Sequence, residues 1–159
     1  MSSMKMSKDT LSVLKNFSQI NSNLLVKPGN RITTVSPAKN IVCEANVSEH
    51  FNVQFGIFDL SKFLGTVSLF EDAEFVFGEK SMQIHSDSGA KISYYYSEPR
   101  LLTTLDREVN MPEPVVSFVI KEHMFENIKR SAAVLQLSDL CIQSNDEGKI
   151  ELVVLLLPT

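Results

Sequence analysis

The stretch that decides the fold is SKDTLSVLKNFSQI, residues 7–20. Ser7 or Asp9 can cap a helix that begins here. Its apolar residues recur at helical spacing and form one stripe: Leu11, Leu14, Phe17 and Ile20. The opposite face carries two lysines and no acidic residue: Lys8, Ser12, Lys15 and Gln19. This stretch therefore predicts an amphipathic helix with a basic outer face.

Outward from this helix, the sequence predicts an α+β fold in which helices pack on antiparallel sheets. A second helix is expected from Asp59 or Ser61 to Phe70. The first two strand-like runs are predicted to form a hairpin, because a Lys-Pro-Gly-Asn turn at 27–30 joins them. The strands expected in this part of the chain are 23–26, 32–35, 41–45, 53–58, 74–77, 82–85 and 91–96.

Residues 97–114 contain three prolines and no sustained period, which predicts a connector between domains. Beyond it we expect a strand at 115–120, a helix at 122–135 with a core face, and strands at 139–143 and 149–154. The order of helix, strand, Gly-containing turn and strand thus occurs twice. The predicted organisation is a first domain at 1–96, a connector at 97–114 and a partial second domain at 115–159.

The length of 159 residues predicts that the second copy is incomplete. A repeat of about 115 residues needs roughly 230 for two full copies. The final apolar run, Leu152 to Leu157, lacks alternation and is interpreted as a buried strand without its partners. The sequence therefore also predicts self-association through this run.

The composition is 43% apolar and 21% charged, which excludes a disordered chain. A net charge of −4 excludes a uniformly basic nucleic-acid binder but leaves room for local basic patches. No apolar run reaches the length of a membrane span, and no signal peptide is recognised. Two cysteines, Cys43 and Cys141, are too few for a disulfide framework or a zinc site, which favours a cytoplasmic protein.

Catalytic patterns are weak. The three histidines, His50, His85 and His123, have no metal-ligand spacing. Cys43 and His50 could be a nucleophile and its base, but the alternation of apolar residues around Cys43 favours a packed thiol. The six glycines are scattered, so no phosphate loop is predicted. We therefore expect no enzyme, no cofactor and no metal.

Basic residues on the outer faces of the predicted helices are the strongest functional signal. They are Lys8, Lys15, Lys62, Lys129 and Arg130. One interpretation is ordinary solvated helix surface. The other is contact with a nucleic-acid backbone without base reading, which is favoured because acidic residues concentrate in linkers, turns and strand ends.

Several short strings, in order across residues 4–72, resemble the sliding clamps of T-even-type bacteriophages. They are Ser7-Lys-Asp-Thr10, Leu14-Lys-Asn-Phe17, Ile20-Asn-Ser22, Glu44-Ala-Asn-Val-Ser48, Phe58-Asp-Leu60, Phe63-Leu-Gly65 and Ser68-Leu69. The resemblance implies a DNA polymerase processivity factor of the PCNA-like ring family. Such subunits have two similar domains and form trimeric rings around duplex DNA. It also implies a polymerase and a clamp loader as partners, in the cytoplasm of an infected bacterium.

The resemblance assigns roles to particular residues. The five basic residues become candidates for the DNA-facing surface. Residues 97–114 correspond to the inter-domain connector, beside which partners dock in this family. The candidates for that contact are Leu101, Leu102 and Leu105, although packing on their own domain is an equal alternative. Because nothing here matches the later strands of the second domain, closure of a ring is in doubt. The alternative function is a truncated, clamp-derived protein–protein interaction module that does not encircle DNA.

Overall fold

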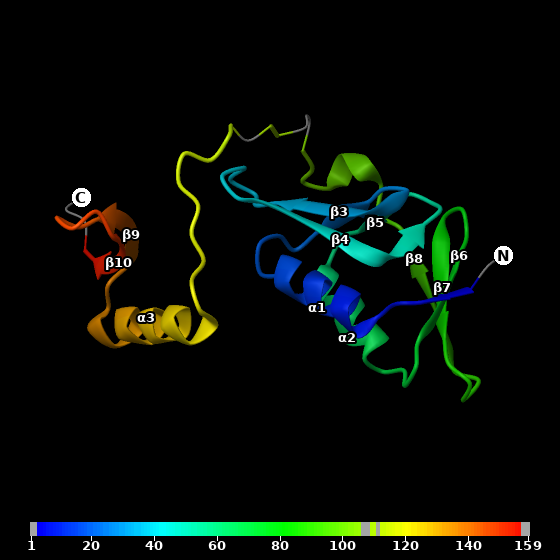
Figure 1. The fold of residues 1–159 in the computed structure, drawn as a ribbon. Coiled ribbons are helices and arrows are strands. Elements are labelled where there is room, and N and C mark those ends of the chain that lie inside the picture. Colours follow the sequence, from blue (N-terminus) through cyan, green and yellow to red (C-terminus); the bar gives the residue numbers. More distant parts are fainter. Residues whose placement is uncertain (1–2, 106–108, 111, 157–159) are drawn as a thin grey trace. The chain divides into compact units, whose positions relative to one another are not determined.

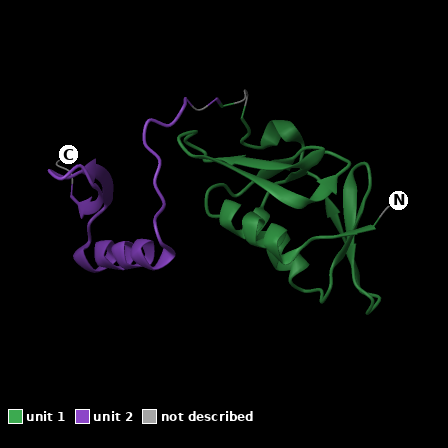
Figure 2. Ribbon diagram, in the orientation of Figure 1, with its two compact units in different colours: residues 1–109 green, residues 110–159 purple. Residues whose placement is uncertain are grey.

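The computed structural model describes residues 3–105, 109–110 and 112–156. It divides into two compact units, unit 1 at residues 1–109 and unit 2 at residues 110–159 (Figure 2). The fold is α+β, with helices packed on antiparallel strands. The two units are described separately below.

Two helices of unit 1 lie side by side, α1 at Lys8–Phe17 and α2 at Leu60–Val67 (Figure 1). Ser7 caps α1, since its Oγ accepts the N–H of Thr10 at 3.2 Å. Asp59 caps α2 by accepting the N–H of Lys62 at 2.9 Å. Both predicted helices are therefore confirmed, although each ends three residues earlier than expected.

A four-stranded antiparallel sheet has the order β1-β6-β7-β8. The three predicted strands of this meander are confirmed. The edge strand β1 was not predicted, because three residues are too few to display a period of two. The strands are β1 at Ser3–Lys5, β6 at Glu74–Phe77, β7 at Ser81–His85 and β8 at Lys91–Tyr95.

The remaining strands of unit 1 form two antiparallel pairs, and here the predicted hairpin is wrong. β2, at Leu24–Val26, pairs with β5, at Phe55–Ile57. β3, at Gly29–Val35, pairs with β4, at Val42–Phe51. Burial decides the pairing, because the end residues of β2 and all of β5 are buried against each other. A turn motif between two strands therefore does not determine whether these strands pair with each other or with other strands.

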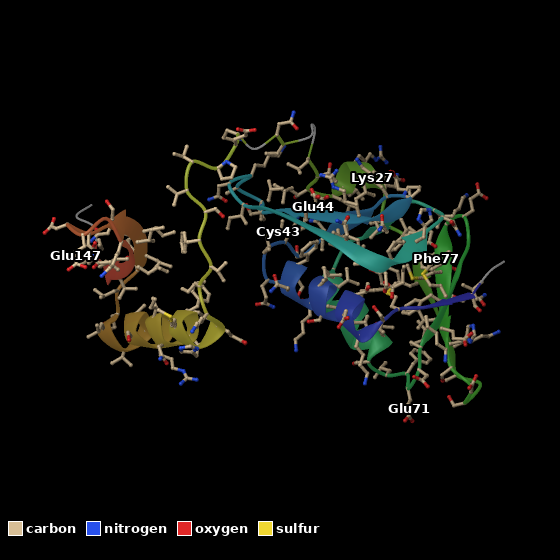
Figure 3. The ribbon with its side chains drawn as sticks, viewed as in Figure 1. Lys27, Cys43, Glu44, Glu71, Phe77 and Glu147 are labelled. Carbon is tan, nitrogen blue, oxygen red and sulfur yellow. The ribbon has the colours of Figure 1, made fainter. Side chains whose placement is uncertain are left out.

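The strands predicted at 41–45 and 53–58 are confirmed as β4 and β5, but β4 extends six residues further than expected. It continues to Phe51 because Val47, Glu49 and Phe51 point inward while the residues between them are exposed. Because Glu49 is charged, the hydrophobicity pattern of the sequence does not reveal that buried and exposed residues alternate here. Cys43, labelled in Figure 3, is half-buried and packs against the core as predicted.

The hydrophobic core of unit 1 lies between the two helices and the strands. Phe63 of α2 is 0% exposed, and its ring centroid lies 5.1 Å from that of Tyr94 and 6.4 Å from that of Phe75. The apolar stripe predicted for α1 is confirmed at Leu14 and Phe17, which are both buried. The other large side chains at the centre are Phe51, Leu60, Met82 and Ile84.

The first residues of the predicted connector lie on unit 1. The N–H of Ser97 donates to the carbonyl of Gly56 at 2.9 Å, and the N–H of Thr103 donates to Oδ1 of Asn23 at 2.8 Å. Between them, a short 3-10 helix at Pro99–Leu101 precedes Leu102, which is buried. This segment, residues 97–103, is therefore part of the packing of unit 1.

Unit 2 contains α3 at Glu122–Leu135, β9 at Asp139–Ser144 and β10 at Ile150–Leu155. The two strands pair antiparallel around a turn in which Gly148 has a φ of 73°. The predicted order of helix, strand, turn and strand is confirmed, so it occurs in both units. Unlike β9 and β10, however, β2 and β3 of unit 1 pair with other strands.

Three expectations for unit 2 are corrected. The predicted strand at 115–120 has no partner strand within the described ranges, and Val115 and Val119 are 99% and 95% exposed. The predicted core face of α3 contains no buried residue. The run from Leu152 to Leu155 is half-buried rather than buried, while Leu157 lies outside the described residues. One helix and two strands provide too little surface to cover these apolar side chains.

None of the helices in the described residues combines the length and the apolar composition that a membrane span requires.

Candidate nucleic-acid interface

The outer face of α1 presents two lysines. Lys8 and Lys15 are seven residues apart, so they lie on the same side of the helix, and both are exposed. Neither forms an ion pair with a described residue. The neighbouring Ser12 and Asn16 are also exposed. The predicted basic face therefore exists as a polar surface whose two lysines form no ion pair with a described residue, although the exposed Asp9 follows Lys8 in the first turn.

The lysine on α2 is exposed but has an acidic neighbour. The side chain of Lys62 is 85% exposed, and its Nζ lies 3.2 Å from Oδ2 of Asp59. The hydrogen bond from the backbone N–H of Lys62 is the main influence that lowers the pKa of Asp59. Because exposed ion pairs are weak, Lys62 can exchange this partner for another anion.

The two basic residues of α3 differ in their surroundings. Lys129 contacts Oε1 of Glu126 at 2.9 Å and lies 5.7 Å from the centre of the Phe125 ring. Arg130 is exposed and has no ion-pair partner among the residues described. The structure thus places three of the predicted basic residues on the helices of unit 1 and the other two on unit 2.

These side chains suit contact with phosphate groups. An exposed ammonium group on a flexible stem attracts a phosphate as a point charge and does not impose a bidentate geometry. Contacts of this kind supply affinity without reading base sequence. The chemistry that the α1 and α2 surface supports is therefore weak, salt-sensitive attraction to a nucleic-acid backbone.

The leucines predicted as partner contacts are not equivalent. Leu101 is 60% exposed, Leu102 is 8% exposed, and Leu105 is half-buried. A Cβ added to Gly56 would lie 2.8 Å from Cδ1 of Leu102, which shows how closely that leucine packs on unit 1. Of the three, only Leu101 presents a large exposed side chain.

The pair considered as a catalytic alternative does not meet. Cys43 and His50 are seven positions apart on β4, where Cys43 faces inward and His50 is exposed. Side chains separated by an odd number of residues on a strand point to opposite faces. The described residues contain no group of three potential metal ligands.

A buried carboxylate beneath α1 is the feature that sequence reasoning missed. Glu49, on β4, is 9% exposed. Its Oε1 accepts the backbone N–H of Ser7, and its Oε2 accepts the hydroxyl of Thr10. Oε2 also accepts the hydroxyl of Ser48 at 3.2 Å. The position of Glu49 between Val47 and Phe51 in an alternating strand was the available signal.

The pKa of Glu49 reflects these contacts. Burial raises the pKa, but hydrogen bonds from the hydroxyl of Thr10 and the backbone N–H of Ser7 outweigh that effect. The net result is a pKa below the ordinary value of 4.5. Glu49 is therefore ionised at neutral pH and is stabilised by neutral donors.

Replacing Glu49 by glutamine should lower the free energy of unfolding of unit 1 by about 1–3 kcal/mol at pH 7. Because the folded pKa is lowered, the carboxylate contributes fully above pH 4.5 and loses its contribution as the pH falls through the folded pKa. The gap between wild type and variant should thus stay constant down to that range and then narrow. Urea unfolding from pH 7 to pH 3, followed by tyrosine fluorescence, measures this gap.

Glu44→Gln is the control for this prediction, since Glu44 lies exposed on the same strand and pairs with Arg31 at the surface (Figure 3). The Glu44→Gln variant should lower the free energy of unfolding by less than about 1 kcal/mol. Equal losses in the two variants, or a gap that widens in acid, would contradict the assigned role of Glu49.

Comparison with known proteins gives consistent matches. A family model described as DNA polymerase processivity factor matches residues 6–97. The sliding clamp of Vibrio phage KVP40 is 32% identical over 144 residues, covering 89% of this chain and 65% of that protein. The sliding clamps of Escherichia phage RB69 and Enterobacteria phage T4 are 29% and 34% identical, each over 92% of this chain and 64% of the relative. The chain thus spans slightly less than two thirds of the length of these relatives.

Proposed function

Because this chain belongs to the DNA polymerase processivity factor family, we propose that it acts as a sliding-clamp subunit. In this role it tethers a replicative polymerase to duplex DNA through contacts that do not depend on sequence. The observation that carries the proposal is the pair of exposed lysines on α1, Lys8 and Lys15, which form no ion pair with a described residue. The family model covers both the helix that bears them and α2.

The proposed action is mechanical and involves no catalytic step or cofactor. A clamp must stay on DNA while it moves, so each contact must form and break easily. Lysine–phosphate contacts across water meet this requirement, because water-mediated contacts retain attraction without fixing a single register. Lys62 on α2 is a further contact that we propose for unit 1, and Lys129 and Arg130 on α3 are the contacts that we propose for unit 2.

The proposal also includes partners. We infer self-association of the chain, a polymerase and a clamp loader, and action in the cytoplasm of an infected bacterium. Residues 97–103 offer the exposed Leu101 as a contact for a protein partner, while Leu102 is already covered by unit 1. The family and the similarity to phage proteins named sliding clamps support this part of the proposal.

The double variant Lys8→Glu/Lys15→Glu should weaken binding to duplex DNA and lower its salt dependence. Loss of two phosphate contacts reduces the slope of log K against log salt by about 1.8. Fluorescence anisotropy of two labelled duplexes with unrelated sequences measures this slope, and wild type should bind both equally. With a cognate polymerase and clamp loader, the same variant should shorten the product made in one binding event.

The matched control is Lys27→Glu/Lys80→Glu, which changes the net charge by the same amount. Lys27 lies in the turn before β3, well separated from α1 in Figure 3, and Lys80 lies in the turn before β7; both are exposed. An unchanged slope in the α1 variant, or an equal decrease in the control, would refute the assignment of the DNA-facing surface. Retained polymerase stimulation without DNA binding would instead indicate a protein–protein module.

A further inference from the structure

We propose that Glu49 is the positioning residue of the DNA-facing helix, because its buried carboxylate fixes the first turn of α1 on β4 and thereby sets where Lys8 and Lys15 lie. This inference rests on the proposed function and adds to it a residue that does not itself face DNA. Glu49 contributes no positive charge and is buried, so it would be overlooked in a search for DNA contacts.

The contacts of Glu49 form a closed network around the start of α1. Its two oxygens receive the backbone N–H of Ser7 and the hydroxyls of Thr10 and Ser48. Ser7 Oγ in turn accepts the N–H of Thr10 at 3.2 Å and donates to the hydroxyl of Thr10 at 3.1 Å. Ser7 Oγ lies 3.3 Å from the Ser48 hydroxyl and is an alternative acceptor for its single hydrogen. Every donor to the carboxylate is neutral.

A helix cap alone does not place a helix on its neighbours. Ser7 satisfies the first turn of α1 locally, which determines where the helix begins. Glu49 instead connects the start of α1 to strand β4. Along the chain it lies 42 residues from Ser7 and 39 residues from Thr10. A ten-residue helix is marginal by itself, so its position is set by such tertiary contacts. The positive end of the helix dipole also favours a carboxylate at this position.

The position of this first turn determines the position of the basic face. Lys8 is the residue directly after the cap, and Lys15 lies two turns later on the same side. Thr10 and Leu14, which are both buried, belong to the side that faces the core. A shift of the first turn would therefore move the lysines relative to any phosphate track that they contact.

Charge and positioning predict opposite results for Glu49→Gln. Removing a negative charge near a cationic surface should strengthen DNA binding if only long-range electrostatics matter. If Glu49 instead holds α1 in place, its replacement should weaken DNA binding. We expect binding to weaken about three- to tenfold at 0.1 M salt, which corresponds to the loss of up to one phosphate contact. Glu44→Gln makes the same charge change on the same strand and should leave binding equal or slightly stronger.

A second variant, Thr10→Val, tests the anchor without changing any charge. It removes a hydroxyl that donates to Glu49 and keeps the shape of the side chain. DNA binding should weaken about two- to fivefold, whereas an account based on charge predicts no change. All variants are compared with wild type at a temperature where circular dichroism shows each to be folded.

Backbone amide exchange in the intact chain provides a readout independent of DNA. Glu49→Gln and Thr10→Val should accelerate exchange at Leu11 and its neighbours in α1, while the amides of α2 stay at wild-type rates. Unchanged α1 exchange together with unchanged or tighter DNA binding would overturn the inference. If wild type itself does not bind the duplex, the proposed function fails, and amide exchange alone decides whether Glu49 anchors α1.

Discussion

Replacing Phe63 by alanine should lower the free energy of unfolding of unit 1 by about 3–5 kcal/mol. Phe63 lies on α2 and is fully buried. Its ring packs edge-on against Tyr94 and also lies next to the ring of Phe75. Removing the ring leaves a cavity that aromatic neighbours on a hydrogen-bonded sheet cannot close. Since single domains have total stabilities of about 5–15 kcal/mol, this loss would be a large share of the whole.

Urea unfolding measures this loss of stability. Tyrosine fluorescence is the signal to follow, because it reports the unfolding of unit 1. The three tyrosines of the chain are Tyr94, Tyr95 and Tyr96, which all belong to that unit. Phe58→Ala is the matched control, because Phe58 is 61% exposed and should cost under about 1 kcal/mol. Comparable losses for the two phenylalanines would mean that α2 does not form the centre of the core.

The Gly56→Ala variant should release residues 97–103 from unit 1 and cost about 2–4 kcal/mol. A Cβ at position 56 would lie 2.3 Å from the carbonyl oxygen of Ser97 and 2.8 Å from Cδ1 of Leu102. The first contact is with backbone, so no rotamer change can relieve it. The hydrogen bond from Ser97 N–H to Gly56 and the burial of Leu102 would be lost together.

Urea unfolding measures the stability of this variant, and trypsin cleavage after Arg100 measures release of the segment. Cleavage should accelerate in Gly56→Ala, because a protease requires an extended and accessible chain. Gly65→Ala is the control: position 65 is within α2, has no neighbour within 4 Å of an added Cβ, and should gain about 0.5–1 kcal/mol. Wild-type stability and cleavage in Gly56→Ala would show that the segment does not pack on β5.

Local patterns predicted the elements that carry their own signals. Both helices of unit 1 have an apolar stripe and a capping side chain, and both were found with their basic residues outward. The meander from β6 to β8 and the hairpin of β9 and β10 have alternating or apolar strands bounded by turns. Lys8 and Lys15 could be identified for the same reason, since a residue's side of a helix follows from its spacing alone.

Patterns failed where the outcome depends on a distant partner. The turn at 27–30 indicated a hairpin, yet β2 pairs with β5, which lies about thirty residues later. The apolar run at 115–120 resembles a strand, but it has no partner strand in the described part of the chain. Glu49 has the charge of a typical surface residue; its place between Val47 and Phe51 indicates an inward side chain, but the contacts that make it a buried acceptor come from α1.

The sequence by itself therefore determined the α+β class, the helices with their basic faces, and the recurrence of helix, strand, turn and strand. These properties follow from the repeat of about 3.6 residues in a helix and of two residues in a strand, and each segment shows its repeat independently of the others. Only the tertiary structure decided which strands pair, that residues 97–103 pack against Gly56, and that Glu49 holds the start of α1. Such contacts join residues that are far apart in the chain, and their free energy exists only once the chain is folded.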